Sequence, residues 1–496
     1  MKKSHSLVLA IVGVVLIALS WWGVLRAQTS LVSRQMERLG VPLLYVAPQK
    51  VQNVPGVLIA HGYAGSKQLM LGYAYTLAHA GYAVMLWDFD SHGANAKPLK
   101  NNSLRENLNV AYTVLLEQPE VDKSRLATLG HSMGSAAVMS AAINQVDRYA
   151  ATVAVSPTGA SITPNVPRNL LLQAGSWENR FVANAERLLV SGGGENHNFT
   201  QGKARKLLII PNAEHITILF RHSSHQAAKD WLNSAFGINS QSNYVDYRML
   251  WYFLHLLGWL TMLAALALLN VRVASGREVI APVLATSSSI HKTGQLKSWM
   301  GLLIAPFVAT GTLILINRLG SLDSLGGVLV GGAISIWFGV AGLSWLIAMR
   351  RLQMPSPRAL VIAIALFIIL WIGFGAMAQI VWLQWWLIPS RLQVFPILAV
   401  ACFPWFLASG VAQQNLNFGQ RFLWWLGQST VLVGGFILVV SYLPQLSFIY
   451  LLLPLFPVFM VIFSFCSGLL NNPWGYALGS TLFFGWVLAS AFPLSI

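Results

Sequence analysis

The five residues from Gly130 to Gly134 combine a nucleophile with the residue types that allow a tight turn. They read Gly-His-Ser-Met-Gly, which fits the pattern Gly-x-Ser-x-Gly. An apolar run (125–130) precedes the turn and a run of small residues (133–144) follows it, so the sequence predicts a strand, a sharp turn and a helix. A Cβ beside such a turn would clash, which explains the glycines. Ser132 is therefore either a nucleophile for acyl chemistry or the cap of a helix, and we interpret it as the nucleophile.

A serine hydroxyl needs a base to take its proton, and the base needs a third group to orient it. His215 follows the last predicted strand (205–211), and we interpret it as the base. His222 and His225 are the alternatives. Their spacing on the next predicted helix could hold a metal, but no acidic ligand is near them, and we expect both at the surface. The sequence therefore predicts no metal site.

The orienting group should be an acid that follows the predicted strand at 169–175. Glu178 has that place, and we interpret it as the acid. Glu195 is the alternative. A glutamate at position 178 could also do no more than stabilise the start of the next helix, where negative charge is favoured.

Strands and helices alternate between residues 41 and 237. Continuous apolar strands between helices predict an α/β fold with a mostly parallel sheet covered on both faces. Polar residues follow five of the strands at their carboxyl ends, where such sheets form their sites. These polar groups are residues 61–63, 88–92, 130–134, 175–178 and 214–215.

With these motifs in this order, residues 41–237 resemble the α/β-hydrolase superfamily, in particular its serine esterases and lipases. Residues 61–66 (His-Gly-Tyr-Ala-Gly-Ser) resemble the oxyanion loop of the family, and residues 88–95 resemble its Asp-x-x-Gly-His-Gly turn, with Ser91 where glycine is usual. The resemblance implies a Ser132–His215–Glu178 triad without a cofactor. It further implies an oxyanion hole made by backbone N–H groups. The donors would be Tyr63 and Met133, and the supporting motif residues His61, Gly62, Gly130 and Gly134.

Only a short connection, residues 157–168, stands where many members of the family carry a cap domain. A short connection leaves the predicted site open. We therefore expect a membrane surface or neighbouring loops to help cover it, and a lipid or an acylated envelope component as substrate.

The composition divides the 496 residues into a polar part and a very apolar part. The chain is 55% hydrophobic and 10% charged, whereas about a quarter of the residues of a soluble domain are charged. Residues 7–25 are long enough to cross a bilayer and lack a following cleavage site, which favours an uncleaved anchor over a signal peptide. Eight more candidate spans follow, near 249–269, 299–317, 325–348, 359–380, 394–412, 422–443, 447–468 and 473–493.

We therefore expect three parts: an anchor (1–25), an α/β-hydrolase domain (26–248) and a membrane domain of about eight helices (249–496). Residues 381–388 (Val-Trp-Leu-Gln-Trp-Trp-Leu-Ile) are typical of an interfacial aromatic belt. Every part thus has a predicted place at or beside a bilayer.

The distribution of Lys and Arg predicts the orientation in the cell membrane. If the N-terminus is cytoplasmic, two short outer loops carry Arg318 and Arg391, while the inner segments carry ten basic residues. That bias places the hydrolase domain on the extracytoplasmic side of an inner or plasma membrane. The inner set is Lys2, Lys3, Arg272, Arg277, Lys292, Lys297, Arg350, Arg351, Arg358 and Arg421.

The net charge of +16 comes without a basic run of the kind that tracks phosphates, so the sequence predicts no nucleic-acid partner. The predicted function is a membrane-bound serine hydrolase that cleaves a carboxylic ester through an acyl-enzyme, with an acyl ester or lipid and the bilayer as partners. Two alternatives stay open. One is an acyltransferase or peptidase with the same triad, and the other is a transport or scaffold protein with a degenerate hydrolase-like binding module.

Overall fold

The computed structural model describes residues 2–240, 242–275, 288–320, 322, 325–350 and 354–495. Arg277 and Arg351, which are among the basic residues that predict the orientation, lie outside the described residues. The chain divides into two compact units. The first, here called the α/β unit, contains Leu19–Phe253 and Met377–Ile388. The second, the helical unit, contains Met1–Ala18, Leu254–Ala376 and Pro389–Ser495.

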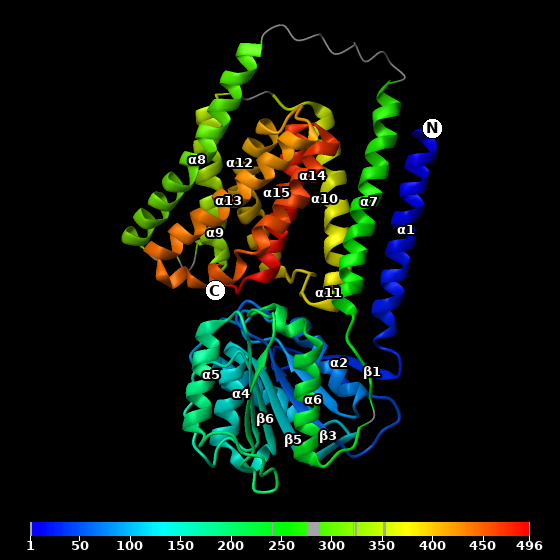
Figure 1. Ribbon diagram of the computed structural model, residues 1–496, viewed down its shortest axis with the longest axis vertical. Coiled ribbons are helices and arrows are strands. Elements are labelled where there is room, and N and C mark those ends of the chain that lie inside the picture. Colours follow the sequence, from blue (N-terminus) through cyan, green and yellow to red (C-terminus); the bar gives the residue numbers. More distant parts are fainter. Residues whose placement is uncertain are drawn as a thin grey trace. The chain divides into compact units, whose positions relative to one another are not determined.

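The α/β unit is built on one eight-stranded sheet with the order β1-β2-β4-β3-β5-β6-β7-β8 (Figure 1). The strands from β4 onward in this order pair in parallel, while β2 pairs antiparallel with β1 and β4. This is the expected α/β-hydrolase type of sheet. The strands are β1 (Leu31–Arg38), β2 (Val41–Pro48), β3 (Val54–Ala60), β4 (Ala83–Trp87), β5 (Val121–His131), β6 (Ala151–Val155), β7 (Leu170–Gly175) and β8 (Arg205–Ile210).

Strand β1 was not expected from the sequence, which predicted the first strand at Val41. It is an edge strand that pairs along its whole length with β2, from Leu31 opposite Pro48 to Arg38 opposite Val41. Leu39 and Gly40 join the two strands with φ of 51° and 70°. Positive φ at both positions is typical of a two-residue hairpin turn.

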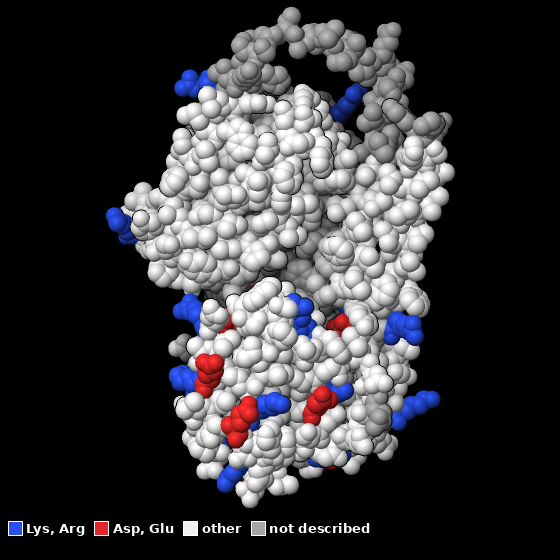
Figure 2. All heavy atoms as spheres, in the orientation of Figure 1, with Lys and Arg blue, Asp and Glu red and all other residues white. Residues whose placement is uncertain are grey.

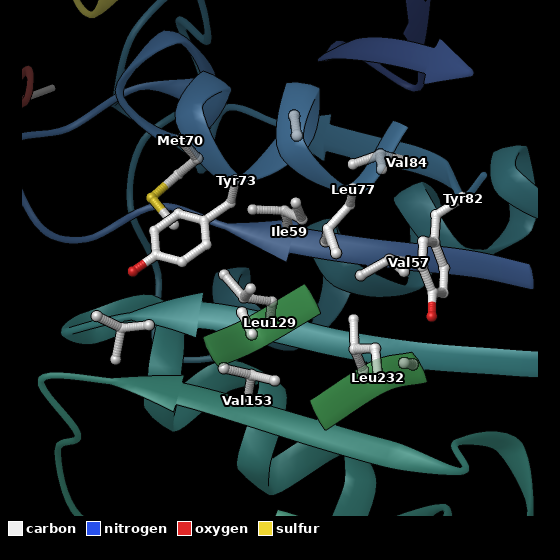
Figure 3. Packing of buried hydrophobic residues seen from close by; sticks show 14 of the residues in the cluster. Val57, Ile59, Met70, Tyr73, Leu77, Tyr82, Val84, Leu129, Val153 and Leu232 are labelled. Carbon is white, nitrogen blue, oxygen red and sulfur yellow. The ribbon is translucent and has the colours of Figure 1, made fainter. Parts of the chain in front are cut away.

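Helices cover both faces of the sheet, because successive strand residues point to opposite sides. Val57 and Ile59 of β3 pack with α2 and α6 on one face, part of which Figure 3 shows. Leu58 and Ala60 pack with α3 and α4 on the other face, and α5 covers the end near β7. The helices are α2 (Leu71–His79), α3 (Ser103–Leu116), α4 (Met133–Asn144), α5 (Asn179–Ser191) and α6 (His222–Phe236). Three short helices lie between these elements: η1 (Lys67–Met70), η2 (Val146–Arg148) and η3 (Thr217–Phe220).

Most of the remaining helices are long and apolar. Figure 2 shows most of the visible charged side chains over the α/β unit and few over the helical unit. The helices are α1 (Lys2–Arg26), α7 (Arg248–Ser275), α8 (Ser288–Leu319), η4 (Leu325–Gly327), α9 (Gly331–Met349), α10 (Pro357–Leu370), η5 (Trp371–Ala376), α11 (Met377–Val381), α12 (Pro389–Ala412), α13 (Phe418–Tyr442), η6 (Pro444–Leu452), α14 (Leu455–Leu470) and α15 (Pro473–Ala491).

Seven helices among the described residues are long and apolar enough to cross a membrane, or eight if the bent pair of η6 and α14 counts as one span. The two halves of that pair meet at 57°. The last predicted span forms α15, which is not among the seven. Its 19 residues include Gly475, Gly479, Ser480, Thr481 and Gly485, which lower its mean hydropathy.

Candidate active site

Ser132 lies at a sharp turn between β5 and α4. Its φ of 51° and ψ of −120° lie outside the regions that L-residues favour, as expected for a strained turn that presents a side chain. A Cβ added at Gly130 would lie 2.3 Å from the carbonyl oxygen of Gly134, and one added at Gly134 would lie 2.5 Å from that of His61. Both positions therefore require glycine, and the second brings the turn against the end of β3.

The structure brings Ser132, His215 and Glu178 into one chain of hydrogen bonds. The distance from Ser132 Oγ to His215 Nε2 is 3.0 Å, and that from His215 Nδ1 to Glu178 Oε2 is 2.8 Å. Ser132 is half-buried, while His215 and Glu178 are 3% and 7% exposed. Glu195, the alternative acid, is exposed.

The Glu178 carboxylate is held by groups that only donate to it. Its Oε1 accepts from the backbone N–H of Gly175 at 2.5 Å and from the Ser156 hydroxyl at 2.7 Å. The other oxygen then faces His215 Nδ1, so a proton on Nδ1 leaves the Nε2 lone pair toward the Ser132 hydroxyl. Sequence reasoning missed Ser156. Its place directly after β6 was the only available signal, and its φ of 45° marks it in the structure.

Burial sets the protonation states of this chain of groups. It raises the pKa of Glu178 and lowers the pKa of His215 to about 4, because charge is disfavoured away from water. His215 is thus a neutral imidazole near neutral pH. In that form it can accept a proton from Ser132.

His131 is a second residue whose position sequence reasoning did not use. Its Nε2 lies 2.9 Å from the carbonyl oxygen of His215, so Nε2 carries the proton and donates. The two rings lie 4.7 Å apart. Burial, followed by the nearby His215, lowers the pKa of His131 to about 3. His131 is therefore a neutral donor that fixes the loop carrying His215.

The loop that follows β3 lies directly against Ser132. A Cβ added at Gly62 would lie 2.8 Å from His131 Nδ1 and 3.1 Å from Ser132 Cβ, so this position also needs a glycine. His61 is fully buried, and its Nε2 accepts from the backbone N–H of Phe89 at 3.1 Å. Its Nδ1 then donates to the carbonyl oxygen of Gly62 at 2.7 Å. These contacts place the predicted donor segment around Tyr63 next to the turn.

The turn after β4 supports the same loop. Asp88 is buried and accepts from the Lys67 backbone N–H at 2.7 Å and from Lys67 Nζ at 2.5 Å. Burial alone would raise the pKa of Asp88, but the Lys67 charge and hydrogen bonds outweigh it and hold that pKa below its usual value. Ser91 has a φ of 65°, which explains why the family usually has glycine at this position.

The two alternative histidines, His222 and His225 of α6, differ in their burial. His222 is exposed, whereas His225 is buried, so the expectation that both lie at the surface was wrong for His225. Its Nε2 bonds the carbonyl oxygen of Leu219 at 2.8 Å, and its ring packs 4.6 Å from that of Tyr73. Among the described residues, no group of three or more His, Cys, Asp or Glu could hold a metal ion.

Comparison with known proteins agrees with this architecture. Residues 52–219 match the family model described as serine aminopeptidase, S33. An uncharacterized protein of Mycobacterium tuberculosis is 31% identical over 150 residues, which are 29% of this chain and 53% of that protein. The chain thus spans about half the length of the curated relatives it matches.

Among solved structures, a dienelactone hydrolase from Anabaena variabilis is 21% identical with a TM-score of 0.32, over 41% of this chain and 97% of that one. An esterase of Pyrobaculum calidifontis is 13% identical with a TM-score of 0.34, over 48% of this chain and 94% of that one. Residues 41–237 form a domain of the α/β-hydrolase superfamily.

Proposed function

We propose that the protein is a serine hydrolase that cleaves a carboxylic ester through an acyl-enzyme on Ser132. The observation that carries this proposal is the chain of hydrogen bonds from Ser132 through His215 to Glu178 at a strained strand-to-helix turn. A degenerate binding module would have no need for this geometry.

In the proposed reaction, Ser132 Oγ attacks the ester carbonyl carbon while His215 Nε2 takes the hydroxyl proton. The carbonyl oxygen becomes an oxyanion that accepts from the backbone N–H groups of Tyr63 and Met133. Collapse of the tetrahedral intermediate breaks the bond to the alcohol oxygen, which leaves with the proton held by His215. A water molecule then repeats the sequence on the acyl-enzyme, releasing the acid and restoring Ser132.

The proposed substrate class is supported by the long apolar helices, many of which carry exposed apolar side chains. Along α8, large apolar residues recur at helical spacing on the exposed surface, a pattern suited to lipid and not to water. These residues are Leu296, Met300, Leu303, Ile304, Phe307, Val308 and Leu315. A membrane-embedded chain meets lipid and acylated envelope components as its most abundant esters. We therefore infer a lipid or acylated envelope component as substrate and the bilayer as partner.

The proposed location is the cell membrane, with the α/β-hydrolase domain on the extracytoplasmic side. The excess of Lys and Arg in the segments predicted to be cytoplasmic supports this orientation. A cysteine introduced at exposed position Glu195 tests it in intact cells with a membrane-impermeant maleimide. Labelling without permeabilisation is expected, and labelling only after permeabilisation would overturn the orientation.

A fluorophosphonate probe tests the proposed nucleophile in the full chain, purified in detergent. Wild type is expected to be labelled at Ser132 and to hydrolyse p-nitrophenyl esters, and Ser132→Ala is expected to do neither. Absence of labelling in folded wild-type protein would refute the proposed function. A series of esters from acetate to palmitate then tests the substrate class, since a lipid hydrolase is expected to favour long acyl chains.

Peptide hydrolysis is a second candidate, favoured by the description of the matched family model as a serine aminopeptidase. The same chain of groups can attack an amide, and His215 would then protonate the departing amine. Aminoacyl p-nitroanilides separate the candidates. A kcat/KM for these amides that exceeds the value for matched esters would support the peptidase.

A further inference from the structure

The segment Met377–Ile388 packs in the α/β unit although it follows that part of the sequence by more than a hundred residues. Helix α11 contacts η1, the short helix directly after the loop that carries Tyr63. Gln68 of η1 donates from Nε2 to Gln384 Oε1 at 2.5 Å, and the two side chains are 5% and 7% exposed. A buried amide pair joins a distant segment to the edge of the candidate site.

The segment is itself held in one conformation by side-chain amides. Gln379 Oε1 accepts from the backbone N–H groups of Trp385 at 2.7 Å and Trp386 at 3.0 Å. Gln384 Nε2 donates to the carbonyl oxygen of Trp386 at 2.9 Å. The Trp385 side chain is fully buried. The Gln384 oxygen therefore meets Gln68 from a fixed position, while Trp386 of the same segment is 54% exposed.

Helix η1 is fixed on its other side by the Lys67–Asp88 pair, whose distances are given above. Only residues 61–66 lie between the end of β3 and η1. His61 fixes the first end of this connection through Phe89, and η1 fixes the second. Because the connection is so short, the position of the Tyr63 N–H depends on both ends.

We propose that Gln68 and Gln384 are positioning residues for the oxyanion hole, through which the segment Met377–Ile388 takes part in the hydrolase site of the α/β unit. This inference rests on the proposed function of Ser132. Gln384 touches neither substrate nor the reacting atoms. It acts by holding η1, and thus the Tyr63 N–H, where the developing oxyanion will be.

The size of the effect follows from what is lost when the contact is removed. Replacing Gln384 by leucine leaves the buried Gln68 amide without its acceptor, so η1 shifts or admits water. Loss of a whole oxyanion donor lowers kcat by about 10²–10³-fold, so a misplaced donor is expected to lower it by about tenfold to a hundredfold. A short water-soluble ester makes few contacts with the enzyme, so its KM is expected to change by less than about twofold.

The test compares wild type, Gln384→Leu and Gln445→Leu as full chains in detergent. Gln445 is an exposed glutamine that donates to Asn317, and its variant is the matched control. Turnover of p-nitrophenyl butyrate gives kcat and KM, and the fluorophosphonate titre gives the fraction of folded sites. A trifluoromethyl ketone, whose adduct carries an oxyanion, is expected to bind Gln384→Leu more weakly by the same factor as the loss in kcat/KM.

A loss of turnover with full titre and weakened ketone binding supports the proposal. An unchanged kcat overturns it, as does a loss that only follows a lower titre. Gln68→Leu and the double variant provide the second check. The double variant is expected to lose no more than either single variant, and multiplied losses would overturn the pairing.

Hydrogen–deuterium exchange separates this inference from the proposed function, because it needs no turnover. Residues 61–70 are expected to exchange faster in Gln384→Leu than in wild type or Gln445→Leu. Unchanged exchange there overturns the positioning role, even if the wild type is an active hydrolase. Faster exchange in a protein without fluorophosphonate labelling would refute only the proposed function.

Discussion

Replacing Glu178 with glutamine tests the assigned order of protons in the site. The new amide keeps an oxygen for the N–H of Gly175 and the hydroxyl of Ser156, so its NH₂ group is turned toward His215. Nδ1 of His215 must then accept, and the ring proton moves to Nε2, where it faces Ser132. In this tautomer the imidazole cannot take the serine proton.

The expected loss of kcat is large, although the substitution replaces only one carboxylate oxygen by an NH₂ group. A triad held in the wrong tautomer loses about 10⁴-fold in kcat, which corresponds to about 5 kcal/mol of transition-state stabilisation. Ser156→Ala removes a single hydrogen bond to the carboxylate and is expected to cost about tenfold, because such a bond to a charged group contributes about 1.5 kcal/mol.

The assay is turnover of p-nitrophenyl butyrate by purified full-length variants. Glu195→Gln, the same substitution at the exposed alternative acid, is the matched control and is expected to retain the wild-type rate. A kcat of Glu178→Gln within tenfold of the wild-type kcat would refute the assigned role of Glu178. A comparable loss in Glu195→Gln would refute it as well.

Three further predictions concern pH, a buried ion pair and a glycine. A base must be neutral to act, so activity is lost as pH falls through the pKa of His215 in the folded protein. Because burial lowers that pKa to about 4, we expect the midpoint of the acid limb of kcat/KM to lie below pH 6.5. A midpoint at or above pH 6.5 would contradict this. Lys67→Met leaves the buried Asp88 carboxylate without its charged partner and is expected to destabilise the α/β unit by about 3–5 kcal/mol. The measurement is the midpoint of thermal unfolding, which is expected to fall. An unchanged midpoint would contradict the prediction. Gly134→Ala puts a Cβ 2.5 Å from the carbonyl oxygen of His61 and is expected to slow fluorophosphonate labelling at least tenfold, a prediction that fails if the labelling rate stays at the wild-type value.

The grouping of the candidate site residues could be predicted because its signals are local. Glycines at 130 and 134 reflect contacts of the turn itself, and polar residues stand where apolar strands end. In a parallel sheet those ends converge on one edge, so order along the chain is enough to assemble candidates for a site. Ser132, His215 and Glu178 come together in the structure for this reason.

What the sequence did not reveal depends on contacts between distant residues. Strand β1 carries Ser33, Arg34, Gln35 and Glu37, which read as a polar linker until β2 pairs with it. The pattern of a half-buried edge strand is weak, because only one side of it faces the core.

The segment Met377–Ile388 is the clearest case of such a distant contact. Tryptophans among apolar residues describe a membrane interface and a protein contact equally well, so the pattern cannot distinguish them. The two glutamines carry the distinguishing information. An amide in an apolar run needs a partner wherever water is excluded, and Gln379 and Gln384 find theirs in the segment's own backbone and in Gln68. A polar side chain inside an aromatic run therefore indicates a contact with another part of the protein, and here that contact leads to η1, next to residues 61–66.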